Sequence, residues 1–241
     1  GWSKTPNGDV AFKDQQVVTN LSDQDNKVVN LYACWESSSV QRYKVSYFSL
    51  AERGTIELKD KDNKPWPNGS RAVKGTKLKW TITAKPGYKA AGVKENGTSK
   101  TGTSGEITVN NVDVELVALF DPIQYKVKYV GGTGATGSMP DQTFTYGQEG
   151  QSLNECKFTK TNSRFLGWSK KNGAKVAEYY DRQPVSTLST TDNATVTLYA
   201  VWVGADAKTY PVNYLQPTGG SLKVTAGGET VGAGTEVLAG T

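Results

Sequence analysis

Residues 125–129 read Tyr-Lys-Val-Lys-Tyr, and the same Tyr-x-Val-x-Tyr pattern returns at residues 43–47 and 210–214. The alternation in each copy has the period of a β-strand, and both Tyr and Val favour strands. The copies begin at residues 43, 125 and 210, which are 82 and 85 residues apart. This spacing indicates a string of small, repeated modules with separate cores.

A second pattern ends each copy. Residues 31–35, 116–120 and 198–202 read Leu-Tyr-Ala-Cys-Trp, Leu-Val-Ala-Leu-Phe and Leu-Tyr-Ala-Val-Trp. The first, third and fifth residues of a strand lie on one face. We therefore expect the Leu, the Ala and the closing aromatic residue to face the core of each module.

The modules are of two types. Gly1-Trp-Ser-Lys4 matches Gly167-Trp-Ser-Lys170, and residues 18–22 match residues 185–189, so the first part of the chain copies the second half of a later module. The tryptophans at the matched positions, Trp2, Trp35, Trp168 and Trp202, are expected to be core residues. Because the chain starts inside a module, we expect further sequence upstream of it.

This comparison predicts four parts. They are a C-terminal half of a type-one module (1–36), a type-two module (37–121), a complete type-one module (122–203) and an N-terminal half of a type-two module (204–241). The joints between them are short and polar, which predicts a semi-rigid, elongated string. Each half module carries an unpaired strand edge, so we expect Val28–Trp35 to pair with another strand, in the same chain or head to tail in the next one.

The composition limits the classes of partner and of cellular setting that we expect. The 241 residues carry 28 Lys and Arg against 23 Asp and Glu, a net charge of +5, and the two signs are interspersed without a nucleic-acid motif. We predict no nucleic-acid partner. No run of 18 apolar residues is present, so we predict no membrane span. The two cysteines, Cys34 and Cys156, fall in different modules and are expected to be free, apolar fillers.

The residue types argue against an enzyme. The chain has no His, which excludes Ser-His-Asp and Cys-His catalysis and every His-ligated metal site. No two carboxylates are convincingly paired for glycoside hydrolysis. We therefore predict no catalytic residue, no cofactor and no metal.

Two kinds of motif resemble ligand sites but lack the flanking residues that such sites require. Gly132–Gly137 spells G-x-G-x-x-G after a strand, but the following residues show no helical periodicity, so we interpret it as a turn. Asp60–Asn63 and Asp23–Asn26 resemble the start of calcium loops, yet the closing Gly and Glu are missing. Hairpin turns are the better interpretation of both.

Trp66 is the one candidate ligand-binding residue. It lies between two prolines in Lys64-Pro-Trp-Pro-Asn-Gly69, a setting that is difficult to bury in a strand. Its ring could stack on a sugar or on a protein partner. The other interpretation, which we favour, is that Trp66 caps the core of its own module.

The repeats resemble a known family. The type-one module is similar to the Listeria–Bacteroides repeat, also called the internalin B-repeat, and the type-two module to its divergent form. The residues that carry the first resemblance are 125–129, 131–137, 144–147, 165–168 and 198–202, and those that carry the second are 75–76, 86–88 and 114–120. Residues 154–161 depart from the family pattern because they lack its Pro-rich approach to Gly-Trp.

The resemblance implies small β-grasp-like modules in bacterial surface proteins. We accordingly expect a mainly β fold, of the α+β kind with a short helix at residues 183–190, in a tandem elongated array. The expected function is that of a non-catalytic, extracellular repeat region that acts as a spacer, a stalk or an adhesion module for a protein or glycan ligand. The alternatives are a carbohydrate-binding module and an accessory region of a secreted hydrolase.

Overall fold

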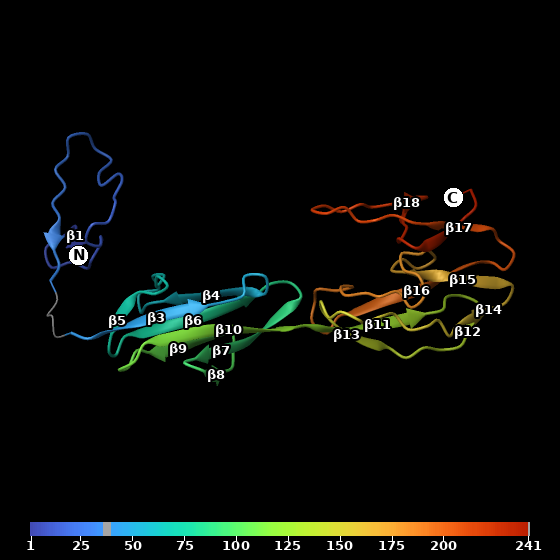
Figure 1. Cartoon of the computed structure of the whole chain (residues 1–241), viewed down its shortest axis with the longest axis horizontal. Coiled ribbons are helices and arrows are strands. Elements are labelled where there is room, and N and C mark those ends of the chain that lie inside the picture. The colour runs from blue at the N-terminus through green and yellow to red at the C-terminus, as the bar shows by residue number, and fades with distance from the viewer. Residues whose placement is uncertain (36–39, 241) are drawn as a thin grey trace.

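The computed structural model describes residues 1–35 and 40–240, and it is built from strands (Figure 1). Twenty strands and no helix are found in this part of the chain. The mainly β prediction is confirmed, but the expected helix at residues 183–190 is wrong. Its backbone N–H groups are used across the fold instead: Val185 donates to the Gln151 carbonyl at 2.9 Å, and Leu188 donates to the Tyr125 hydroxyl at 3.1 Å.

Module A, as we call residues 42–122, consists of two sheets that enclose one core. A five-stranded sheet has the order β5-β3-β10-β7-β8, and a three-stranded sheet has the order β4-β6-β9. The strands are β3 (Arg42–Phe48), β4 (Gly54–Lys59), β5 (Arg71–Val73), β6 (Lys77–Ala84), β7 (Tyr88–Glu95), β8 (Thr98–Lys100), β9 (Ser104–Thr108) and β10 (Val114–Pro122). In β6, buried Leu78, Trp80 and Ile82 alternate with exposed Lys and Thr residues, as a half-buried strand requires.

Module B, residues 124–204, is organised around a single four-stranded sheet. Its order is β13-β11-β16-β15, and a two-stranded sheet, β12-β14, lies beside it. The strands are β11 (Gln124–Val130), β12 (Ala135–Thr136), β13 (Gln142–Thr145), β14 (Thr159–Lys160), β15 (Ser163–Ser169) and β16 (Thr195–Gly204). Trp168 is fully buried at the centre of this module's core, as predicted.

The closing strand β16 faces the core largely as expected. Leu198 is fully buried, and Ala200 packs against the core cluster. Trp202 is partly buried and contacts the ring of Phe165, with ring centroids 5.5 Å apart. Val201 is also buried, on the opposite face of the sheet, because that face is covered as well.

The two modules share one strand order. The first and last strands lie side by side and parallel at the centre of each sheet, β3 with β10 and β11 with β16. An antiparallel partner follows on each flank: β5 and β7 in module A, β13 and β15 in module B. The Tyr-x-Val-x-Tyr openings and the Leu-x-Ala endings therefore form the same central pair in both modules.

The N-terminal part differs from the prediction. Its strands are β1 (Trp2–Ser3) and β2 (Tyr32–Ala33), which pair antiparallel, so Val28–Trp35 is paired over only two of its residues. Trp2 is 38% exposed and Trp35 is 92% exposed, which contradicts their expected place in a core. The reason is that the described residues place no strand on the outer side of β2, where β11 lies beside β16 in module B.

The C-terminal part folds back onto module B (Figure 1). It contains β17 (Thr209–Val212), β18 (Thr225–Ala226), β19 (Glu229–Thr230) and β20 (Thr235–Leu238), and β17 pairs with β20. The Gly232 N–H donates to the Ala177 carbonyl of module B at 3.1 Å. This half module thus joins its neighbour within the chain. No helix in the described residues is long and apolar enough to cross a membrane.

Candidate functional site

The joint between modules A and B is held by a buried side chain and by backbone hydrogen bonds. Strand β10 ends at Pro122 and β11 begins at Gln124, so only Ile123 lies between them. Ile123 is 2% exposed and belongs to the core of module B. Its N–H donates to the Gly87 carbonyl of module A at 3.0 Å, and its carbonyl accepts from the Tyr146 N–H of module B at 3.0 Å. The crossing residue is therefore held from both sides.

Further contacts cross the joint beside Ile123. The Gly87 N–H donates to the Thr190 carbonyl at 3.0 Å, and the rings of Tyr88 and Tyr146 meet edge to face with centroids 5.5 Å apart. Such an aromatic pair contributes about 0.5–1.5 kcal/mol beyond its buried area. The ion pair of Lys89 with Asp192, at 3.8 Å, adds little because both side chains are partly exposed.

Gly87 has a conformation and a packing that only glycine satisfies. Its φ angle is +92°, and a Cβ atom at this position would overlap the ring of Tyr146. In the sequence, Pro86-Gly87-Tyr88 serves only as a marker of the repeat, and the joint is expected to be polar. The sign of a buried joint was the isolated Ile123, an apolar residue in the middle of that joint.

Trp66, the candidate ligand-binding residue, is partly buried and packs against the core of module A. Its backbone N–H donates to the Leu58 carbonyl at 2.8 Å, and its backbone carbonyl accepts from the Tyr47 hydroxyl at 2.9 Å. The indole Nε1 is buried and has no hydrogen-bond partner among the described residues. The packing of the ring against the core of module A is that of a cap on the module's own core.

No protein-family model matches the chain, and a comparison with curated proteins finds no similar protein. The proposed function therefore rests on the geometry of the modules and their contacts.

Module A carries an apolar hollow on its outer face, which no sequence motif indicated. The outer hollow of module A has a volume of about 630 Å³ and lies on the face of the five-stranded sheet that points away from the core. Phe48 and Leu50 are 51% and 52% exposed there, next to Val117 and Leu119 of β10. Two apolar residues at outward positions of β10 could have indicated this hollow. In a strand with one solvated face, these positions are usually polar.

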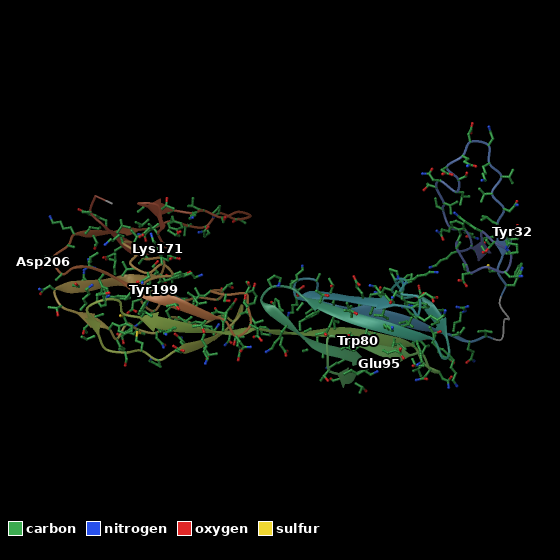
Figure 2. The ribbon with its side chains drawn as sticks, turned by 180° about the vertical axis from the view of Figure 1, so that it is seen from behind. Tyr32, Trp80, Glu95, Lys171, Tyr199 and Asp206 are labelled. Atoms are coloured by element: carbon green, nitrogen blue, oxygen red, sulfur yellow. The ribbon has the colours of Figure 1, made fainter. Side chains whose placement is uncertain are left out.

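The contact of module B with the C-terminal part is made by ionic groups around a hollow of about 510 Å³. Arg164 binds Glu236 at 2.9 Å and also donates to the Thr209 hydroxyl at 2.7 Å. Lys171 lies between module B and the C-terminal strands in Figure 2, and its Nζ binds Glu229 at 2.6 Å. The hydrogen bonds that Glu229 accepts from Lys171 and from the Lys175 N–H lower the pKa of its carboxyl.

The motifs that resembled ligand sites are turns. In the G-x-G-x-x-G stretch, the Ala135 N–H donates to the Gly132 carbonyl at 3.2 Å, and strand β12 (Ala135–Thr136) lies within the stretch, where a dinucleotide site would need the start of a helix. The Asp60 carboxylate accepts from the N–H groups of Asp62 and Lys64, which closes the hairpin turn without a ligand. In the part of the chain that the structure describes, no group of three or more His, Cys, Asp or Glu residues is placed to bind a metal.

The two cysteines are free, and both are partly buried. Burial raises the pKa of the Cys156 thiol to about 11. The thiol is therefore protonated at neutral pH, and the protonated form is a poor nucleophile. Cys156 packs against the core of module B, in line with the expected role as a filler.

Proposed function

We propose that this chain is a non-catalytic repeat region of a bacterial secreted or cell-surface protein and that it acts as a spacer. The observation that carries the proposal is the joint at Ile123, where one buried residue and backbone hydrogen bonds on both sides connect two modules. A connection of this kind transmits orientation, whereas a flexible linker of polar residues does not. A rod of such modules would hold a distal domain at a fixed distance from its anchor.

The strand order supports the family part of the proposal. A mixed sheet with its first and last strands parallel at the centre, and with antiparallel strands on both flanks, is the arrangement of β-grasp sheets. Both module types have it, although their sequences differ outside the opening and closing strands. We therefore propose that modules A and B are β-grasp-like repeats of the B-repeat kind, arranged in tandem along an elongated molecule. The carbohydrate-binding alternative is not proposed, because Trp66 packs against the core of its own module.

The stiffness of the joint is tested by distance measurements between the modules. Spin labels at Lys79→Cys and Lys128→Cys, on exposed strand positions of modules A and B, are placed in a Cys34→Ser, Cys156→Ser background. We expect one narrow distribution of distances. Gly87→Ala should broaden it, because the new Cβ displaces the Tyr146 ring that packs across the joint.

Gly97→Ala is the matched control for this experiment. Gly97 also has a positive φ, of +84°, but it lies in the β7–β8 turn, and a Cβ there meets nothing within 4 Å. The substitution has the same backbone strain and leaves the joint intact, so the distribution should stay narrow. A broad distribution in the parent protein would contradict the spacer proposal.

A further inference from the structure

The chain contains four Asn-Gly pairs, at residues 7–8, 68–69, 96–97 and 172–173. In such a pair, the backbone nitrogen of the glycine can attack the side-chain amide carbon of the asparagine, because glycine has no Cβ to hinder the approach. The reaction needs an asparagine amide that is free to turn and a glycine nitrogen that is free to attack. The hydrogen bonds of the four pairs therefore decide which of them reacts.

Two of the pairs are restrained at the asparagine side chain. Asn68 accepts from the Tyr47 N–H through Oδ1 at 2.9 Å and donates to the Tyr47 carbonyl through Nδ2 at 2.8 Å. Asn96 accepts from the Glu115 N–H through Oδ1 at 2.7 Å and donates to the Asp113 carbonyl through Nδ2 at 3.0 Å. Each amide group is thus fixed by two hydrogen bonds, which must break before the glycine nitrogen can attack.

The pair at residues 7–8 is restrained at the glycine nitrogen. The Gly8 N–H donates to the Thr5 carbonyl at 3.2 Å, which closes the turn that follows β1. A Cβ atom on Gly8 would overlap the hydroxyl groups of Ser3 and Thr5, so the backbone of this glycine is closely surrounded. Its nitrogen must leave a hydrogen bond before it can react.

The pair Asn172–Gly173 lacks both restraints. It lies in the corresponding turn of module B, but Gly173 is the third residue of that turn, and the turn is closed by Ala174, whose N–H donates to the Lys171 carbonyl at 3.4 Å. Within the part of the chain that the structure describes, neither the Asn172 amide nor the Gly173 N–H forms a hydrogen bond. Both residues are exposed, and a Cβ atom on Gly173 would meet nothing within 4 Å. The asparagine amide and the glycine nitrogen are therefore free to meet.

We propose that Asn172 is a site of spontaneous deamidation and that this modification weakens the hold of module B on Glu229. The Gly173 nitrogen attacks the Asn172 Cγ and loses its proton, the Cγ–Nδ2 bond breaks, and ammonia leaves as a succinimide ring forms. Water then opens the ring at either carbonyl, which leaves aspartate or isoaspartate at position 172. Water is the only other reactant, and the product carries a negative charge that asparagine lacks. The inference goes beyond the spacer role and does not depend on it.

The new charge would lie in the turn that holds the C-terminal part. The Lys171 Nζ, which Figure 2 shows beside the C-terminal strands, binds Glu229 at 2.6 Å, and the Lys175 N–H donates to the other oxygen of the same carboxylate at 2.7 Å. A carboxylate at position 172 repels Glu229 and competes for the Lys171 ammonium group. Isoaspartate also lengthens the backbone between Lys171 and Lys175 by a methylene group. Both changes loosen the contact.

Prolonged incubation of the full 241-residue chain at slightly alkaline pH, followed by peptide mass spectrometry, tests the assignment. We expect deamidation at Asn172 to be about tenfold faster than at Asn68 or Asn96, because two hydrogen bonds of ordinary strength restrain each of those amides. The amide resonance of Gly232, which donates to the Ala177 carbonyl of module B, should move towards an undocked position as the product accumulates. Asn172→Gln should remove both changes, since attack on the longer side chain would have to form a less favourable six-membered ring.

Asn172→Asp supplies the charge at once and should shift the Gly232 resonance without incubation. Asn111→Asp is the matched control, because Asn111 is also exposed but lies in module A, so the resonance should stay in place. Equal rates of deamidation at Asn172, Asn68 and Asn96 would overturn the proposal. A Gly232 resonance that does not move while Asn172 is converted would overturn it as well.

Discussion

Trp168 and Trp35 show that a sequence motif alone does not decide burial. Both belong to the repeated tryptophan positions, yet one is fully buried and the other is 92% exposed. Trp168 contacts the rings of Tyr129 and Phe165, with centroids 4.8 and 4.9 Å away. Those rings come from parts of the module that residues 1–35 do not contain. Core positions were predictable for the complete module, and the exposure of the half module was not.

Truncation of these two tryptophans should have opposite outcomes. Trp168→Ala should lower the free energy of unfolding of module B by about 3–5 kcal/mol, the usual cost of removing a large aromatic side chain from a core. Trp35→Ala should change the stability by no more than about 0.5 kcal/mol, as is usual for an exposed side chain. Urea titrations of both variants measure the difference. Similar losses would mean that Trp35 is buried in solution.

At the scale of elements, the opening and closing strands were predictable, and their partners were less so. Local alternation identifies β3, β11 and β16, because the pattern depends only on which face of a strand is buried. Pairing depends on residues far away in the chain. Strand β17 opens like β3, yet the two strands have different partners. Strand β17 pairs with β20, which begins at the Thr of Gly234-Thr235. Strand β3 pairs with β5, which ends before the matching pair Gly75-Thr76.

The incorrect helix at residues 183–190 has a similar cause. Its polar and β-branched residues are weak helix formers, and neighbouring strands provide acceptors for their N–H groups. The joint between modules A and B could not be predicted for the same reason. Nothing near Gly87 in the sequence indicates that Tyr146 packs against it. Such contacts between distant residues determine the candidate site, which is why sequence patterns identified Trp66 and missed Ile123.

The attachment of the C-terminal part to module B should depend on pH. Hydrogen bonds from Lys171 and from the Lys175 N–H lower the pKa of Glu229, and those from Thr209 and Arg164 lower the pKa of Glu236. Both carboxyls thus bind protons less readily when docked. The two carboxylates therefore stabilise the docked arrangement at a pH above 4.5, the ordinary pKa of a Glu side chain. This stabilisation is lost as the pH falls through the lowered pKa of each group.

The amide resonance of Gly232, which donates to Ala177 of module B, reports this docking in NMR spectra. We expect it to move towards an undocked position as the pH falls below the ordinary value of 4.5, with the amide resonances of the core strands of module A unchanged. A Glu229→Gln, Glu236→Gln double variant removes both titrating groups, so its Gly232 resonance should show no such transition. A transition of the same size in the double variant would assign the effect to other groups.

At the scale of the whole molecule, the sheets of modules A and B follow one another along the long axis (Figure 1). A compact globule of 241 residues would have a radius of gyration of about 18 Å. Small-angle scattering should give a clearly larger value, because the modules are joined end to end at Ile123. Gly97→Ala should leave this value unchanged. A value close to that of the globule would show that the modules collapse onto each other in solution.

The parallel central pair of each sheet has a mechanical consequence. Because the first and last strands run side by side in the same direction, the chain enters each module at one end and leaves it at the opposite end. Tension applied along the chain therefore pulls β11 and β16 past each other and loads the hydrogen bonds between them in shear. Bonds loaded in this way share the force and must break together, whereas those of a hairpin pulled from its open end break one at a time. The same strand pair that lies at the centre of each sheet also opposes extension of the chain.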